Sequence, residues 1–255
     1  MELSNLQSSV GSTTSIKFIE EVAIIITARN LTPTMMSQEF LKSSGIIPQR
    51  WELAQQPVLN PNVAQLTFQN GVNIVAQPGS LNLSEPLGDK NLTEVSIAQI
   101  AGQYVTKLPH AEYQGFSLNP KIIAPIPDNP AAIRNYFTQT LLNQGSWQDI
   151  GRGLIQANIN LLYQLEKCQL SVSISQATLQ APQQNPLFAV LFSGNFNYNL
   201  VANNQQQKIE RLIQAIQSWH IDFKTFRSIV SQQFLEQASL LQPIPEAMIF
   251  PMSTM

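Results

Sequence analysis

Apolar and polar residues alternate along most of the stretch between residues 151 and 200. Because successive side chains of a β-strand point to opposite faces of a sheet, this alternation predicts a three-stranded antiparallel meander with one apolar and one polar face. The expected strands start at Ile155, Cys168 and Phe188, and the third ends at Leu200. This meander is the clearest structural signal in the chain.

Two loops are possible in the first hairpin of the meander. A two-residue loop (Glu166-Lys167) and a four-residue loop (Leu165 to Cys168) both pair Tyr163 with Leu170, and both gather the apolar side chains on one face. Glu-Lys is a poor sequence for a two-residue primed turn, since that turn needs positive φ. We therefore expect the four-residue loop.

The polar face of the meander carries amides and hydroxyls rather than charges. A solvated sheet face usually carries charged residues, which also guard against edge pairing. An uncharged face is easier to dehydrate if a partner satisfies its hydrogen bonds, so one interpretation is a surface for a protein partner or for self-association. The alternative is that the chain simply builds its surfaces from Gln and Ser. The residues of this predicted interaction face are Gln156, Asn158, Asn160, Gln164, Gln169, Ser171, Ser173 and Ser175.

Before the meander, the β-branched run from Val22 to Ile26 predicts a strand covered on both faces, within residues 16–29. A helix should follow. Thr32 is its expected N-cap, Pro33 fits its first turn, and Gly45 fits a left-handed stop.

A hairpin is predicted around Asn70-Gly71. A three-residue loop with Gly71 left-handed in a bulge pairs Phe68 with Val72 and places the apolar residues of both strands on one face, whereas a two-residue loop mixes the faces. We expect the bulged loop. Residues 81–83 should extend the second strand beyond a kink at Pro78-Gly79.

Further elements follow from helical spacing and capping signals. The predictions are a helix capped by Thr93 and running to Leu108, an extended segment from Tyr113 to Pro127, a helix capped by Asp128 or Asn129 that ends near Gly145, a helix from Gln205 to Trp219, and a helix that starts at Asp222.

We therefore predict an α+β protein with antiparallel sheets packed against helices. The expected organisation is a disordered arm (1–15), a first α+β unit (16–127), a second unit packed on the first as one globular body (128–240) and an extended tail (241–255). The order of elements also suggests a duplicated β-α-β-β-α unit. Three residues recur at a spacing of 96 or 97, namely Pro33, Phe40 and Trp51 as Pro130, Phe137 and Trp147.

Composition narrows the possible functions. Only 12% of the 255 residues are charged, and Gln (30) and Asn (20) take their place. A net charge of −2 with unclustered basic residues argues against nucleic-acid binding. A single cysteine fits a reducing compartment, and neither a signal peptide nor a membrane-length apolar run is present in the sequence. We expect a cytoplasmic protein.

Several short motifs of the first third carry a resemblance. They are Phe40-Leu41, Gly45-Ile46-Ile47-Pro48, Trp51-Glu52-Leu53-Ala54, Asn70-Gly71-Val72 and Ala76-Gln77-Pro78. On these motifs, residues 20–85 resemble a family of uncharacterised proteins that is associated with cyanobacteria, and the Gln- and Asn-rich composition is similar to that of many cyanobacterial proteins. The resemblance implies no activity and no site residues.

Candidate catalytic groups are few. Cys168 is expected on the apolar face, where a thiol behaves as a small hydrophobe. His110 should lie at a helix C-terminus, and His220 and Asp222 would face different directions on one helix. Arg152, between two glycines, precedes a strand and not a helix N-terminus, so the phosphate-cradle mechanism does not apply. Two histidines and one cysteine cannot complete a closed zinc site, and we predict neither a metal nor a cofactor.

Our first functional hypothesis is a non-enzymatic interaction or accessory protein that acts in a homo-oligomer or a heteromeric complex, because no acid/base or nucleophile constellation is evident. The second is a small-ligand-binding domain with a pocket between sheet and helices, lined by Trp51, Trp147 or Tyr163. An enzyme that uses His110 or His220 ranks third.

Overall fold

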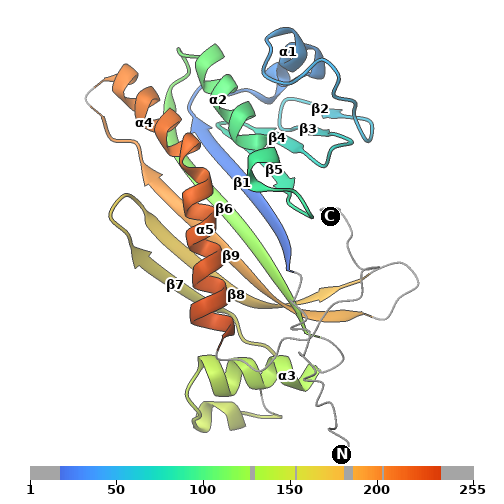
Figure 1. Cartoon of the computed structure of the whole chain (residues 1–255), viewed down its shortest axis with the longest axis vertical. Helices are drawn as coiled ribbons and strands as arrows, with labels where there is room; N and C mark the ends of the chain where they lie inside the picture. Colours follow the sequence, from blue (N-terminus) through green and yellow to red (C-terminus); the bar gives the residue numbers. More distant parts are fainter. Residues whose placement is uncertain (1–17, 127–129, 153, 181–185, 203, 237–255) are drawn as a thin grey trace, which may run out of the picture.

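The computed structural model describes residues 18–126, 130–152, 154–180, 186–202 and 204–236. These residues form one antiparallel sheet of nine strands (Figure 1), where the sequence suggested more than one sheet. The strand order is β2-β3-β4-β5-β1-β6-β9-β8-β7. The predicted arm and tail lie outside the described residues. The strands are β1 (Ile19–Ala28), β2 (Val58–Leu59), β3 (Ala64–Thr67), β4 (Asn73–Gln77), β5 (Ser80–Pro86), β6 (Tyr113–Ile126), β7 (Ile159–Gln164), β8 (Gln169–Leu179) and β9 (Leu187–Asn199).

Helices α2, α4 and α5 cover one face of the sheet (Figure 1), which confirms the α+β class with an antiparallel sheet. None of the helices in the described residues combines the length and the apolar character that a membrane crossing requires. The helices are α1 (Gln38–Ser43), α2 (Ile97–Lys107), α3 (Pro130–Asn135), α4 (Gln205–Gln217) and α5 (Trp219–Ser228), with π-helical turns at Tyr136–Leu141 and Ile229–Leu235 and 3₁₀ turns at Pro33–Met35, Leu92–Glu94 and Ser146–Asp149.

The hydrophobic core lies between the sheet and this helix layer. Ile24 of β1, Leu118 of β6 and Phe223 of α5 are all fully buried, and burial of each such side chain stabilises the fold by about 1.5–3 kcal/mol. We expected β1 to be covered on both faces. The helices cover only the face that carries Ile24. Ala23 and Ile25 point to the opposite face, where they line a hollow.

The meander is confirmed as β7, β8 and β9. Tyr163 pairs with Leu170, and the strands are joined by the four-residue loop, in which the Leu165 N–H donates to the Cys168 carbonyl at 2.9 Å. The first strand is shorter than expected. It starts at Ile159, and the side chain of Ile155 is 86% exposed, because the residues before Ile159 have no pairing partner on β8.

The bulged hairpin between β3 and β4 is also confirmed. Phe68 and Val72 share a 2.9 Å backbone hydrogen bond, and Gly71 has φ +88°. The kink expected at Pro78-Gly79 is wrong: these residues form a tight turn, so the following residues become the separate strand β5, in which Ser80 pairs with Gln77. Pro followed by a Gly of positive φ is the sequence of a type II turn, which reverses the chain.

Three helices start at other residues than expected. Ser37 and not Thr32 caps α1, with its hydroxyl accepting from the Phe40 N–H at 3.1 Å. Thr93 caps nothing, because α2 starts at Ile97. α5 starts at Trp219, before the expected Asp222. The caps proposed at residues 128 and 129 lie outside the described residues.

Candidate binding face of the sheet

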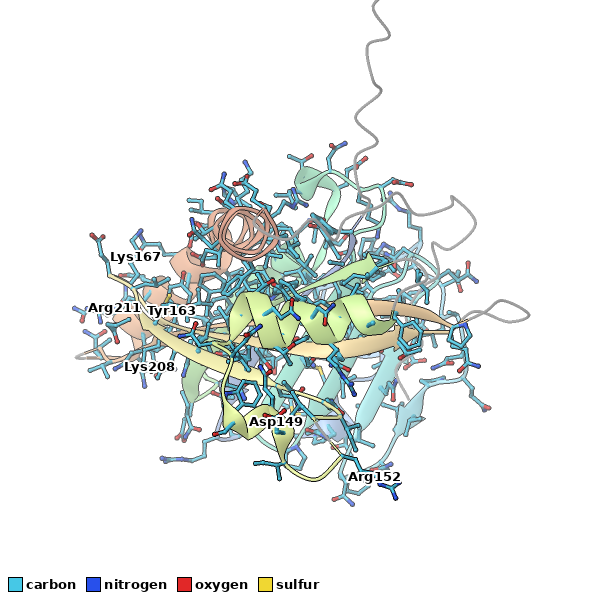
Figure 2. The ribbon with its side chains drawn as sticks, turned by 90° about the horizontal axis from the view of Figure 1, so that it is seen from below. Asp149, Arg152, Tyr163, Lys167, Lys208 and Arg211 are labelled. Carbon is cyan, nitrogen blue, oxygen red and sulfur yellow. The ribbon has the colours of Figure 1, made fainter. Side chains whose placement is uncertain are left out.

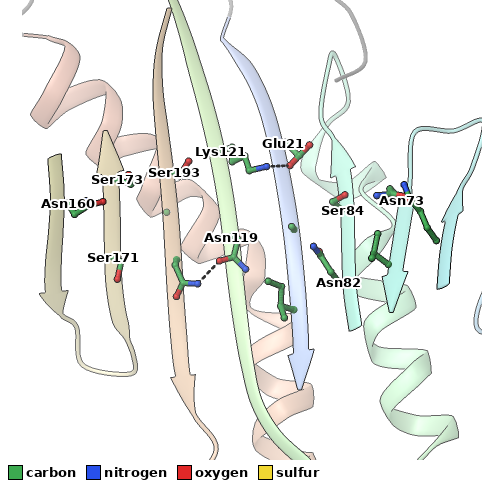
Figure 3. A pocket seen from close by; sticks show the side chains of 16 residues that line it. Glu21, Asn73, Asn82, Ser84, Asn119, Lys121, Asn160, Ser171, Ser173 and Ser193 are labelled. Carbon is green, nitrogen blue, oxygen red and sulfur yellow. Dashed lines mark hydrogen bonds and ion pairs between the residues drawn. The ribbon is translucent and has the colours of Figure 1, made fainter. Parts of the chain in front are cut away.

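The face of the sheet opposite α2, α4 and α5, here called the open face, contains a hollow of about 600 Å³ (Figure 3). We call this hollow the trough. Side chains from eight strands line it, because each strand turns alternate residues to this face. Its uncharged polar residues are Gln65, Asn73, Asn82, Ser84, Asn119, Asn160, Ser171, Ser173, Ser193 and Asn195.

The trough is long and shallow. Neighbouring strands lie about 4.8 Å apart, so eight strands from β3 to β7 span about 34 Å. A volume of about 600 Å³ spread over that width leaves little depth at any point. The shape therefore suits an elongated partner better than a compact one.

In the half of the trough nearer β3, apolar side chains surround one unsatisfied amide. Ala23, Ile25 and Val75 line it there, and Asn82 lies between Ile25 and Val75 on the neighbouring strands. The Asn82 side-chain oxygen is buried and has no hydrogen-bond partner among the described residues. A buried acceptor without a partner is costly, by about 1–3 kcal/mol, so a bound molecule that supplies a donor would favour a turn of the Asn82 amide that brings this oxygen into the trough.

The trough contains one charged pair, which neutralises itself. Lys121 of β6 lies opposite Glu21 of β1, and the Lys121 Nζ is 2.9 Å from a Glu21 carboxylate oxygen (Figure 3). Next to this pair, the Asn195 side-chain amide donates to the Asn119 side-chain oxygen at 2.6 Å, and Asn119 donates to the Ser117 hydroxyl at 3.2 Å. These contacts fix the orientation of the polar groups, while the trough stays electrically neutral.

The structure splits the predicted interaction face. Its middle members, Asn160, Ser171 and Ser173, line the trough. Ser175 follows on β8 and pairs with Leu191 of β9. The other members lie elsewhere: Gln164 and Gln169 border a separate hollow of about 490 Å³ at the hairpin end, and Gln156 and Asn158 lie before β7, hydrogen-bonded to each other at 3.4 Å.

Most of the trough comes from strands that sequence reasoning did not connect with the meander. Ser193 and Asn195 could have been found, since they alternate with Phe192 and Phe196 on β9. Asn73 and Asn82 could not, because their distance from the meander depends on the strand order, which local patterns do not reveal.

The two histidines do not meet. His110 lines a hollow of about 220 Å³ together with Met35 and Lys107, and no carboxylate lines that hollow. His220 lies in the first turn of α5 with its ring 6.4 Å from that of Trp219. Asp222, two residues on, accepts a hydrogen bond from the Tyr198 hydroxyl.

Cys168 and Asp222 lie in a partly buried environment near Tyr198. Burial raises the pKa of the Cys168 thiol, and the negative charge of Asp222 raises it further. Burial likewise raises the pKa of Asp222, although the Tyr198 hydrogen bond opposes the shift. A thiol with a raised pKa is a poor nucleophile at neutral pH, so this geometry does not activate Cys168.

The remaining candidates are dispersed. Trp51 packs on Phe68 with ring centroids 5.3 Å apart, Trp147 is 37% exposed, and Tyr163 is 40% exposed on β7. None of these three residues lines the hollows described above. Arg152 points outward at the margin of the molecule (Figure 2). Among the described residues, His, Cys, Asp and Glu side chains nowhere gather in groups of three that could hold a metal ion.

No known protein-family model matches the chain, and no curated protein matches its sequence.

Proposed function

We propose that this protein is a cytoplasmic, non-enzymatic interaction protein that acts in a homo-oligomer or a heteromeric complex and receives a partner on the open face of its sheet. The observation that carries the proposal is the trough, a neutral hollow lined by eight strands, seven of which contribute uncharged hydrogen-bonding side chains. Moving amides and hydroxyls from water into an interface costs little free energy when each regains a hydrogen bond there. Burial of unpaired charges would cost much more.

The shape of the trough favours an extended polypeptide segment as the partner. An extended chain advances about 3.4 Å per residue, so a span of about 34 Å accommodates about ten residues. Such a segment would place an apolar side chain over Ile25 and Val75, and a donor near the Asn82 oxygen. Its own charge should be small, because Lys121 and Glu21 already neutralise each other.

A small polar ligand is the second candidate. About 600 Å³ lies within the range of small-molecule sites, which is about 300–1,000 Å³. The unsatisfied Asn82 oxygen would serve such a ligand equally well. We rank this candidate second because the trough is long and shallow. A ligand of this kind would be detected as a small molecule that copurifies with the protein.

The proposal is tested by crowding the trough without disturbing the core. Ser171 and Ser173 lie side by side on the open face of β8. The double variant Ser171→Lys, Ser173→Lys should fold normally, because both side chains point to solvent, and should lose the partner, because two long charged side chains fill the trough. The measurement is native mass and mass-spectrometric composition of the tagged protein isolated from the cells that it comes from.

A matched control carries the same added charge on the opposite side of the molecule. Gln214→Lys with Gln217→Lys places two lysines on exposed positions of α4. The proposal expects a bound protein in stoichiometric amount with the wild type and this control, and its loss with the trough variant. Equal recovery of the partner with both double variants would contradict it.

We also propose that the two halves of the chain derive from one duplicated unit. The strand order supports this, because β3-β4-β5-β1 and β7-β8-β9-β6 are equivalent arrangements that meet at the β1–β6 pair. In the first half, β1 is followed by the short helix α1 and, after β2, by β3, β4 and β5. In the second half, β6 is followed by the short helix α3 and then by β7, β8 and β9. Absence of any similarity between matched strands in a large set of related sequences would contradict this origin.

A further inference from the structure

The two edges of the sheet are built differently. β2 forms one edge, with only two residues, and lies between Pro57 and Pro61. Short edge strands and prolines are devices that prevent a further strand from adding. β7 forms the other edge, with six residues (INLLYQ) that include neither a charge nor a proline. Figure 1 shows the two strands at opposite margins of the sheet. Among the residues that the structure describes, these devices occur at the β2 edge and not at the β7 edge.

β7 also exposes apolar side chains. Leu162 is 67% exposed and Tyr163 is 40% exposed, and Tyr163 lies near Lys167 at the margin of the molecule in Figure 2. An exposed, uncharged edge strand with apolar side chains is a ready template for pairing with another strand.

The backbone of β7 shows which groups are free to pair. The Leu165 N–H bonds to the Cys168 carbonyl, and the β7–β8 register continues without a shift to Ile159. Hydrogen-bonded and non-hydrogen-bonded pairs alternate along an antiparallel ladder. Counting back from Leu165, the N–H and C=O groups of Asn160, Leu162 and Gln164 point away from β8, toward the open edge.

We propose that β7 pairs with β7 of a second copy of this chain, antiparallel, about a two-fold axis that passes through Leu162. In this register Leu162 lies opposite Leu162 of the second copy, and Asn160 lies opposite Gln164. All outward N–H and C=O groups of both strands then find partners. The pairing joins two sheets into one continuous sheet.

The side chains of β7 fit this register. Asn160 meets Gln164, so amides face amides, while Leu161 meets Tyr163 and Leu162 meets itself, so apolar groups face apolar groups. No like charges come together, because the strand has none. Cross-strand pairs of this kind each add stability, and this is the reason to expect a second copy and not an unrelated strand. The pairing uses the sheet edge, so it can fail while the trough still binds its partner.

The first test measures the molar mass of the purified chain by light scattering over a concentration series. The wild type should reach twice the monomer mass of 28.4 kDa. Leu162→Lys should remain a monomer, because two lysines would lie directly opposite each other. The control is Ile155→Lys, which adds the same charge at an 86% exposed position before β7 and should still dimerise.

A second variant covers the case in which Leu162→Lys fails to fold. Leu162→Pro removes an N–H that points away from β8, so the hairpin keeps its hydrogen bonds while the edge loses one that the dimer needs. Circular dichroism should show the wild-type fold and light scattering a monomer. A wild type that stays at 28.4 kDa at the highest concentration overturns the proposal, and so does a folded Leu162 variant that dimerises like the wild type.

The register has its own test, by disulfide formation with diamide, which takes up the two thiol hydrogens. Leu162→Cys should cross-link to itself. Asn160→Cys and Gln164→Cys should cross-link only when mixed, since Asn160 of one copy lies about 14 Å from Asn160 of the other, beyond the reach of a disulfide. Self-cross-linking of Asn160→Cys as fast as that of Leu162→Cys would overturn this register.

Discussion

Gly194 of β9 lies against Phe226 of α5. A Cβ at this position would lie 2.8 Å from the ring of Phe226 and 2.9 Å from the Pro120 Cγ. Both neighbours belong to the buried layer between sheet and helices, so they have little room to move. Glycine is needed here for close packing and not for backbone conformation.

We expect Gly194→Ala to lower the free energy of unfolding by about 1–3 kcal/mol, the usual cost of overpacking a core. The control is Gly102→Ala in α2, where an added Cβ meets nothing within 4 Å. This control should raise the free energy of unfolding by about 0.5–1 kcal/mol, because alanine favours a helix interior. Urea unfolding measures both, and equal stability of Gly194→Ala and the wild type would show that Phe226 can move aside.

Asp222 predicts a pH dependence at the residue scale. Burial raises its pKa above the ordinary value, and the hydrogen bond from Tyr198 only partly opposes this shift. A carboxyl whose pKa is higher in the folded than in the unfolded state holds its proton more tightly when folded. Its contribution to stability is therefore lost as the pH rises from the ordinary aspartate pKa of about 4 through the raised value.

Asp222→Asn removes this titration while keeping an oxygen that accepts from Tyr198. We expect the wild type to lose stability relative to this variant as the pH rises above the ordinary aspartate pKa of about 4, as measured by urea midpoints at each pH. The control is Asp149→Asn at an exposed position. A constant difference between wild type and Asp222→Asn over this range would contradict the assigned shift.

At the scale of elements, one carboxylate ties the N-terminus of α2 to the sheet. Glu85 of β5 is 1% exposed, and it accepts from the N–H groups of Ser96 (2.7 Å) and Ile97 (3.2 Å) at the start of α2. Lys90 Nζ lies 2.8 Å from its other oxygen. A carboxylate at a helix N-terminus also interacts favourably with the helix dipole.

Glu85→Gln should lower the free energy of unfolding by about 2 kcal/mol. The N–H groups of Ser96 and Ile97 would then bond to a neutral amide in place of a carboxylate, and the amide NH₂ would face groups that are themselves donors. Thermal unfolding followed by circular dichroism measures the change. Glu52→Gln removes an exposed carboxylate 3.7 Å from Lys42 and should change stability by less than about 1 kcal/mol. Similar effects of the two substitutions would mean that Glu85 does not anchor α2.

Elements were predictable where their chemistry is local. The Gly71 bulge and the four-residue loop after Gln164 follow from turn requirements and from the need to keep apolar residues on one face. The start of α2 was missed because its cap comes from Glu85, on another strand, and no pattern near Thr93 reveals it. The Pro78-Gly79 turn carried a readable signal, which the apolar residues after it obscured.

At the scale of the whole molecule, the sequence could indicate which residues share a face of one strand, but not which strands are neighbours. Asn160, Ser171 and Ser173 were found because one hairpin connects them. Asn73 and Asn82 join the same trough only through a strand order in which β1 and β6 lie at the centre. The strand order depends on how the whole sheet packs against the helices, which involves residues far apart in the chain. No local sequence pattern therefore reveals it.

The position of the trough over the central strands has a consequence for amide hydrogen exchange. β1 and β6 have hydrogen-bonded neighbours on both sides, so their amides should exchange slowly although water covers their side chains on the open face. Deuterium should enter from the β2 edge, and in the monomer also from the β7 edge, which the proposed β7–β7 pairing would protect. A partner bound in the trough would then cover amides that are already protected, and side-chain labelling is the method that would reveal it.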